Sequence, residues 1–263
     1  MGVAEIEVAR VGGRSVVTRA RATSPLRLLT PRNHGDGAWV YLSSFGGGLV
    51  DGDRLRVSIR TLGDTTALLT TQAQTKAYRA RTRGSSQDLA ADVAPGGLLV
   101  IAPDPVACFR GAIYAQSSRA DIAPGGSLVH VEALARGRGW GLARYASELV
   151  VVRDGARVLR DATHLDPAHG DVAARMGRFA VIGTVVAIGP RAARVRDAMR
   201  AVAARPLQRG APLLAAASRP SGIDDAIVVR LATVTTDVYV ATVRAMLAPA
   251  IDELGDDPFA RKW

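Results

Sequence analysis

The chain has one cysteine, Cys108, and no long apolar run among its 263 residues. A single thiol excludes an intrachain disulfide framework and a zinc site built from cysteines, which favours a reducing compartment. No stretch approaches the ~18 to 20 apolar residues needed to cross a bilayer. The N-terminal sequence MGVAEIEVARVGGR lacks the basic region and apolar stretch of a secretory signal. We therefore expect a soluble, cytoplasmic protein with no membrane partner.

Aromatic residues are also scarce, at 5% of the chain, whereas hydrophobic residues reach 48%. The core must therefore be built mainly from Val, Leu, Ile and Ala, which favours many thin layers. A chain of this length buries roughly three quarters of its unfolded surface, so it needs no disulfide to fold. We expect one domain over residues 1–263, with a β body over about 1–176 and a C-terminal α+β part over about 177–263.

Lysine is nearly absent, since only Lys76 and Lys262 accompany the arginines that give a net charge of +10. This charge predicts a positive surface suited to acidic partners. A basic, β-rich nucleic-acid-binding protein is the alternative, and its affinity would fall steeply with salt. Against it, the arginines are scattered along the chain, and three Trp, five Tyr and four Phe supply few stacking platforms for bases.

A strand-like pattern recurs about every 30 residues in the first half of the chain. The stretch LRVSIRTL (55–62) alternates apolar and polar residues and ends at a Gly-Asp turn. The pattern returns over 88–103 and 119–134, where Ala-Pro-Gly-Gly separates two short strands. Such a unit cannot bury its own apolar face and must stack on its neighbours. Stacked coils of a β-helix and ordinary hairpins of a β-sandwich both fit this pattern.

Two further strands, 147–154 and 156–165, are predicted to form a hairpin around an Asp-Gly turn. The residue pattern then changes, because 178–189 is a continuous apolar run. The segment 190–206 has the pattern of a helix that opens at a proline and carries an apolar stripe. These features stand in the sequence at Pro190, Val195, Met199 and Val202.

The last part of the chain predicts a strand over 225–233 and a helix over 235–255. Thr236 is the expected N-cap, and Pro249 predicts a kink or break. Segment 205–222 is interpreted as a loop. The fold class is therefore mainly β, with a β-helix-like stacked-sheet body and a small C-terminal α+β region containing two helices.

The glycine-rich stretch SSFGGGLVDGDRL (43–55) lacks the Gly-Lys-Ser/Thr of a phosphate loop and leads into a strand. Asp51 and Asp53 lack the other oxygen ligands of a calcium loop. The stretch is therefore interpreted as a tight structural turn. The four histidines are too far apart in sequence for a local metal site and are interpreted as surface or satisfied core residues; they are His34, His130, His164 and His169.

No catalytic site is predicted, because the chain has no Gly-x-Ser-x-Gly elbow and Cys108 has no evident activating partner. A β-helix hydrolase would need two or three carboxylates converging in an open groove. Asp53, Glu132 and Asp161 lie in or beside predicted strands, where burying a charge is costly. Taken singly, each of them is interpreted as solvated.

Three blocks of sequence resemble the urease accessory protein UreD (UreH) family, in the order and at the spacing of that family. GGGLVDGDRL (46–55) is similar to its GGxVGGDxL signature, TTQAQTKAYR (70–79) to its TTxxATKxYR block, and PDPVACFRGAIYAQ (103–116) to its LPDPVxxFxxAxYxQ segment. ALARGR (133–138) and PFARKW (258–263) are also similar to family features.

This resemblance implies a non-enzymatic chaperone with a β-helix-like body and C-terminal helices. It implies binding to UreF, UreG and apo-urease subunits, assistance to nickel insertion, and a dimeric complex formed through partners. No tightly bound cofactor is implied, only transient Ni²⁺. Five polar positions match those that the family links to an internal metal route, namely Asp53, Thr75, Lys76, Glu132 and Asp161. Carboxylate oxygens bind Ni²⁺ weakly enough to release it, unlike imidazole or thiolate.

The chain departs from the family pattern at several positions. Asp51 replaces the usual glycine of the Gly-Gly-Asp turn, and Gln72 and Gln74 stand in the Thr-Thr block. GRGWGLARY (137–145) lacks the glycine and glutamate of GRxxxGExF. These differences mark a divergent member of the family that the chain resembles.

Overall fold

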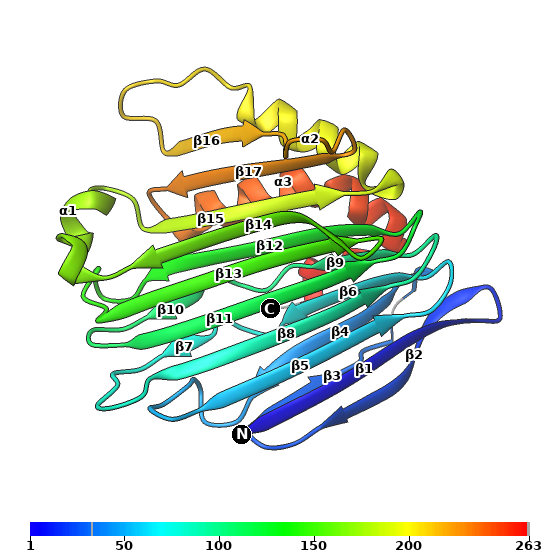
Figure 1. The fold of residues 1–263 in the computed structure, drawn as a ribbon, viewed down its shortest axis with the longest axis horizontal. Coiled ribbons are helices and arrows are strands. Elements are labelled where there is room, and N and C mark those ends of the chain that lie inside the picture. The colour runs from blue at the N-terminus through cyan, green and yellow to red at the C-terminus, as the bar shows by residue number, and fades with distance from the viewer. Residues whose placement is uncertain (33, 262–263) are drawn as a thin grey trace.

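Two β-sheets packed face to face form the body of the molecule in the computed structural model, which describes residues 1–32 and 34–261 (Figure 1). The sheet in front in Figure 1, sheet A, has seven strands. In order across the sheet they are β14 (Ala156–Leu165), β13 (Arg144–Arg153), β11 (Ile113–Ile122), β8 (Ser85–Val93), β5 (Arg54–Thr61), β1 (Gly2–Val11) and β2 (Arg14–Ala22).

Sheet B lies behind sheet A and extends further at one side. Its main path runs through β16 (Leu213–Ser218), β17 (Ala226–Thr233), β15 (Val181–Ile188), β12 (Ser127–Arg136), β9 (Leu98–Ile101), β6 (Thr66–Thr71), β4 (Ala38–Ser44) and β3 (Leu26–Leu29). Two short strands, β7 (Lys76–Ala77) and β10 (Val106–Cys108), pair with each other, and β10 also pairs with β12.

The chain alternates between the two sheets, so successive coils stack in parallel. β5, β8, β11 and β13 pair in parallel in sheet A, and β4, β6, β9 and β12 do so in sheet B. The turns between the sheets stack as well: Gly63, Gly96 and Gly125 all have positive φ. A Cβ added at Gly125 would lie 3.8 Å from the backbone nitrogen of Gly96. The predicted stacked-coil body is confirmed, and the hairpin sandwich is wrong.

Alternation along the strands builds two apolar cores. One lies between the sheets, where the inward residues are mostly Val, Leu, Ile and Ala. The other lies between the back of sheet B and the helices α2 (Ala193–Ala203) and α3 (Thr236–Leu254). Strand β12 contributes to both, with Leu128 and Leu134 in the first and Val129 and Val131 in the second. Its even-numbered residues therefore face the interior between the sheets.

The C-terminal part confirms the two predicted helices and corrects their details. Val195, Met199 and Val202 form the buried stripe of α2, which follows the 3-10 turn η2 (Pro190–Ala192). The N-cap of α3 is Thr235, not Thr236, because Thr235 has the extended backbone of a cap. Its Oγ1 accepts a hydrogen bond from the Val238 amide at 3.2 Å.

Pro249 does not break α3, which continues to Leu254. The buried side chains of Met246, Leu247 and Ala250 hold this part of the helix against sheet B, which offsets the lost backbone hydrogen bond. The predicted loop 205–222 is also partly wrong, because it contains β16. This strand exists through its antiparallel pairing with β17, which a short run of leucine and alanine does not reveal.

A short helix, α1 (Val172–Met176), lies just before the expected boundary near residue 176, after the 3-10 turn η1 (Pro167–His169). The turn η3 (Pro258–Arg261) ends the described chain, and residues 262–263 of the PFARKW segment lie outside it. None of the helices in the described part combines the length and apolarity that crossing a membrane requires.

Candidate functional site

Glu132 lies on the inner face of β12, between the two sheets. Its neighbours Val131 and Ala133 point the other way, into the core against the helices. The Tyr145 hydroxyl donates a hydrogen bond to Glu132 Oε1 at 3.4 Å. Gln116 and Ser147, from the facing sheet, also hydrogen-bond to the Glu132 carboxylate. Two strands of the facing sheet, β11 and β13, thus supply the hydrogen-bond partners of this one carboxyl group.

Burial raises the pKa of Glu132, and the nearby Asp161 carboxylate acts in the same direction. The hydrogen bonds from Ser147, Gln116 and Tyr145 partly oppose this shift because they stabilise the charged form. Glu132 is thus a carboxyl group that takes up a proton more readily than an exposed glutamate. A divalent cation would compete with that proton for the same oxygens.

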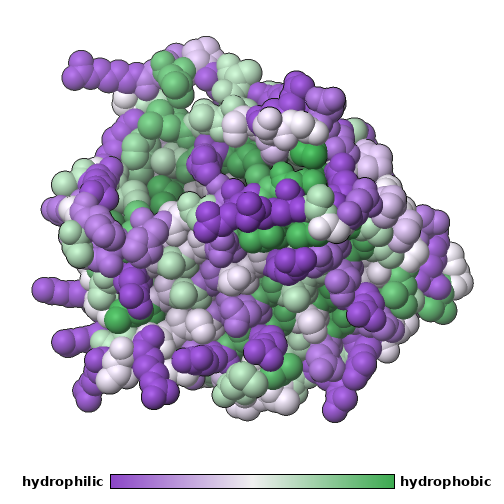
Figure 2. Space-filling view, in the orientation of Figure 1, coloured by the Kyte–Doolittle hydropathy of each residue, from purple (hydrophilic) through white to green (hydrophobic). Residues whose placement is uncertain are grey.

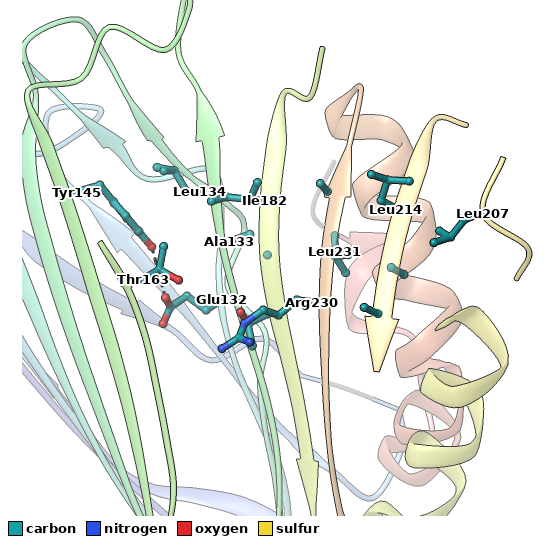
Figure 3. A pocket seen from close by; sticks show the side chains of 15 residues that line it. Glu132, Ala133, Leu134, Tyr145, Thr163, Ile182, Leu207, Leu214, Arg230 and Leu231 are labelled. Carbon is teal, nitrogen blue, oxygen red and sulfur yellow. Dashed lines mark hydrogen bonds between the residues drawn. The ribbon is translucent and has the colours of Figure 1, made fainter. Parts of the chain in front are cut away.

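Glu132 and Tyr145 line a cavity of about 480 Å³ (Figure 3). Thr163 of β14 and Arg230 of β17 line it too, and Figure 3 shows both near Glu132. Most of the remaining lining is apolar and comes from Leu134, Ile182, Leu207, Leu214 and Leu231, with several alanines.

Asp161 is buried beside this cavity and forms an ion pair with Arg230. The interpretation of Asp161 as a solvated carboxylate is therefore wrong. The sequence pattern did not predict this ion pair, because Arg230 stands within the otherwise apolar stretch of β17. Its side chain is 60% exposed, so the pair joins a buried carboxylate to an accessible guanidinium.

Thr75 and Lys76 line a second cavity, of about 410 Å³. Leu42, Leu49 and Leu55 from the core between the sheets also line it, so this cavity reaches the same interior. Its polar lining includes Ser44, Thr71, Gln74 and Gln87. Of the five expected site residues, the structure thus places Thr75 and Lys76 at this cavity and Glu132 at the other, while Asp161 reaches the first cavity only through its ion pair with Arg230.

A row of amides lies between the two cavities. Gln87 of β8 lines the second cavity and is in register with Gln116 of β11. Gln116 in turn hydrogen-bonds to Glu132, which lines the first cavity. Sequence reasoning missed both glutamines, although Gln116 stands two residues after Tyr114, which is buried on the inner face of the same strand.

Asp53 lines neither cavity. Its Oδ2 accepts a hydrogen bond from the Val50 amide at 2.8 Å, which closes a local turn. Asp51 nearby does more, because its carboxylate accepts bonds from the backbone amides of residues 81 to 84 at 2.7 to 3.0 Å. These bonds hold the pKa of Asp51 well below its usual range, although burial opposes them. The turn is structural, as the glycine pattern predicts.

Among the residues that the structure describes, the other titratable groups do not form a conventional metal or nucleophile site. Burial raises the pKa of the Cys108 thiol to about 12, so it stays protonated and unreactive. His164 and His169 come close, with ring centroids 5.8 Å apart, which their sequence spacing did not predict. Within residues 1–32 and 34–261, no group of three His, Cys, Asp or Glu residues is placed to hold a metal ion.

Comparison with known proteins decides the family. The model of the UreD urease accessory protein family matches residues 1–263. The chain belongs to this family. The urease accessory protein UreD of Sorangium cellulosum (strain So ce56) is 49% identical over 267 residues, covering 100% of this chain and 84% of that protein.

More distant relatives carry the same description. The urease accessory protein UreD of Anaeromyxobacter sp. (strain Fw109-5) is 40% identical, over 99% of this chain and 89% of its own length. Urease accessory protein D of Oryza sativa subsp. indica is 29% identical, over 97% and 94% respectively. Membership of the family gives the chain a role in urease maturation, and its relatives are named as accessory proteins rather than as catalysts.

Proposed function

We propose that this UreD-family chain is a non-catalytic cytoplasmic scaffold that binds apo-urease together with UreF and UreG and passes Ni²⁺ through its interior. The observation that carries the nickel part is the polar row inside an apolar body. Gln87, Gln116 and Glu132 lie in a row between two cavities, within a core whose buried side chains are mostly aliphatic. Buried polar groups weaken a core unless they serve a purpose, and a passing hydrated cation would use them.

The chemistry of this row suits transfer rather than storage of nickel. Glu132 offers carboxylate oxygens, the glutamines offer amide oxygens, and Cys108 is held as a thiol. Such oxygen ligands bind Ni²⁺ more weakly than imidazole or thiolate, so a cation can enter and leave. Arg230 already neutralises Asp161, so Glu132 supplies the main negative charge for a cation in this region.

The scaffold role is tested by urease activation. The urease genes and accessory genes are expressed in a host without urease, with and without this chain, at limiting nickel. We expect loss of urease activity and of urease-bound nickel when the chain is absent, and co-purification of the chain with UreF, UreG and urease subunits. Normal urease activation in the absence of this chain would contradict the proposal.

The nickel route is tested by a matched pair of variants. Glu132→Gln removes the interior charge, whereas Glu148→Gln removes a charge on β13 of the facing sheet, where Glu148 pairs with Arg160 at the surface. We expect Glu132→Gln to lower activation at limiting nickel while complex formation persists. Glu148→Gln should leave activation unchanged. Equal activation by the two variants would contradict an interior route through Glu132.

A further inference from the structure

Sheet B continues past the last strand of sheet A. Sheet A ends at β14, whereas sheet B runs on through β15 and β17 to its own edge strand, β16 (Figure 1). Burial along β17 shows where cover is lost, because Val228 is 5% exposed while Arg230 and Ala232 on the same face are accessible. On β15, Val186 is fully buried and Ile182 is only half-buried. One end of these strands therefore lacks a facing strand.

Strand register assembles this uncovered area, here called the open face, from two rows. Ile182, Ala232 and Leu214 form one row, and Thr184, Arg230 and Ala216 form the other. All six residues line the cavity of about 480 Å³. Figure 2 shows hydrophobic side chains gathered on this part of the molecule, with hydrophilic ones around them. The open face is thus an apolar sheet surface with one accessible arginine in it.

The surroundings of the open face are basic. From residue 204 to residue 222 the chain has three arginines, Arg205, Arg209 and Arg219, and no acidic residue. Arg219 pairs with Asp224 at 3.3 Å, so the charge of this edge comes mainly from Arg205 and Arg209. Leu207, between the first two, is 71% exposed and lines the cavity. A contiguous exposed apolar patch rimmed by polar residues marks an interaction site, and Leu207 extends the apolar patch of the open face. The arginines attract acidic partners to this surface and repel basic ones.

We propose that the open face is the docking site for an extended segment of a partner protein in which apolar and acidic side chains alternate. The proposal rests on the scaffold function above, which requires surfaces for partner proteins. Placed beside β14, such a segment would add an eighth strand to sheet A. Its alternate side chains would point at Leu214 and Ala232, and the others toward solvent and the arginines.

A second copy of this chain fits the open face poorly. Self-association through β16 would bring two sets of these arginines together on molecules that each carry a net charge of +10. Like charges facing each other across an interface oppose binding, whereas acidic side chains would be attracted to the same rim. Charge complementarity therefore favours an acidic partner.

The test uses the full-length chain and short synthetic peptides that alternate leucine with glutamate, labelled with fluorescein. Fluorescence anisotropy at low salt should show saturable binding that weakens as salt rises. Peptides with lysine in place of glutamate, or serine in place of leucine, should bind about tenfold more weakly or worse. Hydrogen exchange of β14 should slow on binding, since an added strand pairs with its free backbone groups.

Two adjacent alanines of β16 provide the matched variants. Ala216 lines the cavity, whereas Ala217 is exposed on the opposite face of the same strand. Ala216→Glu should weaken binding of the acidic peptide about tenfold, and Ala217→Glu, with the same added charge, should leave it within about twofold. Both positions are exposed, so neither change disturbs the core.

Three outcomes would overturn the proposal. Equal losses in the two variants would place binding elsewhere, and equal binding of the lysine peptide would remove the charge argument. Concentration-dependent dimers of the chain that Ala216→Glu abolishes would make a second copy the occupant. Because none of these measurements involves nickel or urease activity, failure of the docking site and failure of the scaffold function are distinguishable.

Discussion

His130 should make the stability of this protein fall steeply between neutral and mildly acidic pH. Its side chain is on the inner face of β12, in register with Ile101 on one side and Val186 on the other. Burial lowers the pKa of His130 from 6.5 to about 4, because the imidazolium would lose its hydration there. Below pH 6.5 the unfolded chain therefore takes up a proton at this residue that the folded chain does not.

The sign follows from that difference in proton uptake. The folded state loses stability relative to the unfolded state as pH falls below 6.5, and the loss levels off below a pH of about 4. At about 1.4 kcal/mol per pKa unit, the full effect is about 3 kcal/mol. Between about pH 8 and about pH 5 it amounts to about 2 kcal/mol, or roughly a thirtyfold change in the unfolding equilibrium.

Urea unfolding at these two pH values measures the effect directly. His130→Phe and His130→Gln keep a side chain of similar size but cannot titrate, so their stability should fall about 2 kcal/mol less on acidification. His164→Phe is the control, because His164 is exposed on β14. The reasoning is refuted if the pH dependence of unfolding is the same in the parent chain and in both His130 variants.

Three further predictions concern other parts of the fold. Glu132→Gln should raise the urea midpoint at neutral pH, because a raised pKa means that the charged form destabilises the folded state as pH rises; a lower midpoint would argue against this. Asp51→Ala should speed amide hydrogen exchange at residues 81 to 84, and unchanged exchange would show that these hydrogen bonds are dispensable. In the parent chain, the stability that Asp51 provides should be lost as pH falls below the ordinary pKa of 3.8 for this group. Leu99 is fully buried between the sheets, so Leu99→Ala should lower the free energy of unfolding by about 2 to 5 kcal/mol. Leu207 is 71% exposed, so Leu207→Ala should change it by no more than about 0.5 kcal/mol. Similar losses in the two variants would contradict the assigned core.

The stacked body could be predicted from sequence because its units repeat. Each coil must place a glycine with positive φ where the chain passes from one sheet to the other, and Gly63, Gly96 and Gly125 mark those places. Strand β16 could not be predicted in the same way. Its residues neither alternate nor carry turn signals, and it becomes a strand only because β17 offers an edge to pair with.

The candidate site shows the same division between local and non-local information. Thr75 and Lys76 are adjacent in sequence, so a single motif predicts their shared position at one cavity. Glu132 and Gln116 come from strands of different sheets, and Asp161 pairs with an arginine 69 residues further along. No spacing rule connects such residues, because the contact depends on the thickness of the body and on where sheet A stops.

The same missing strand that leaves Arg230 accessible also opens the cavity beside Glu132, so anything that docks on the open face would control access to the interior carboxylate. If the docking site and the nickel route both exist, occupying the one should slow cation entry at the other, and Ala216→Glu should relieve that block without touching Glu132.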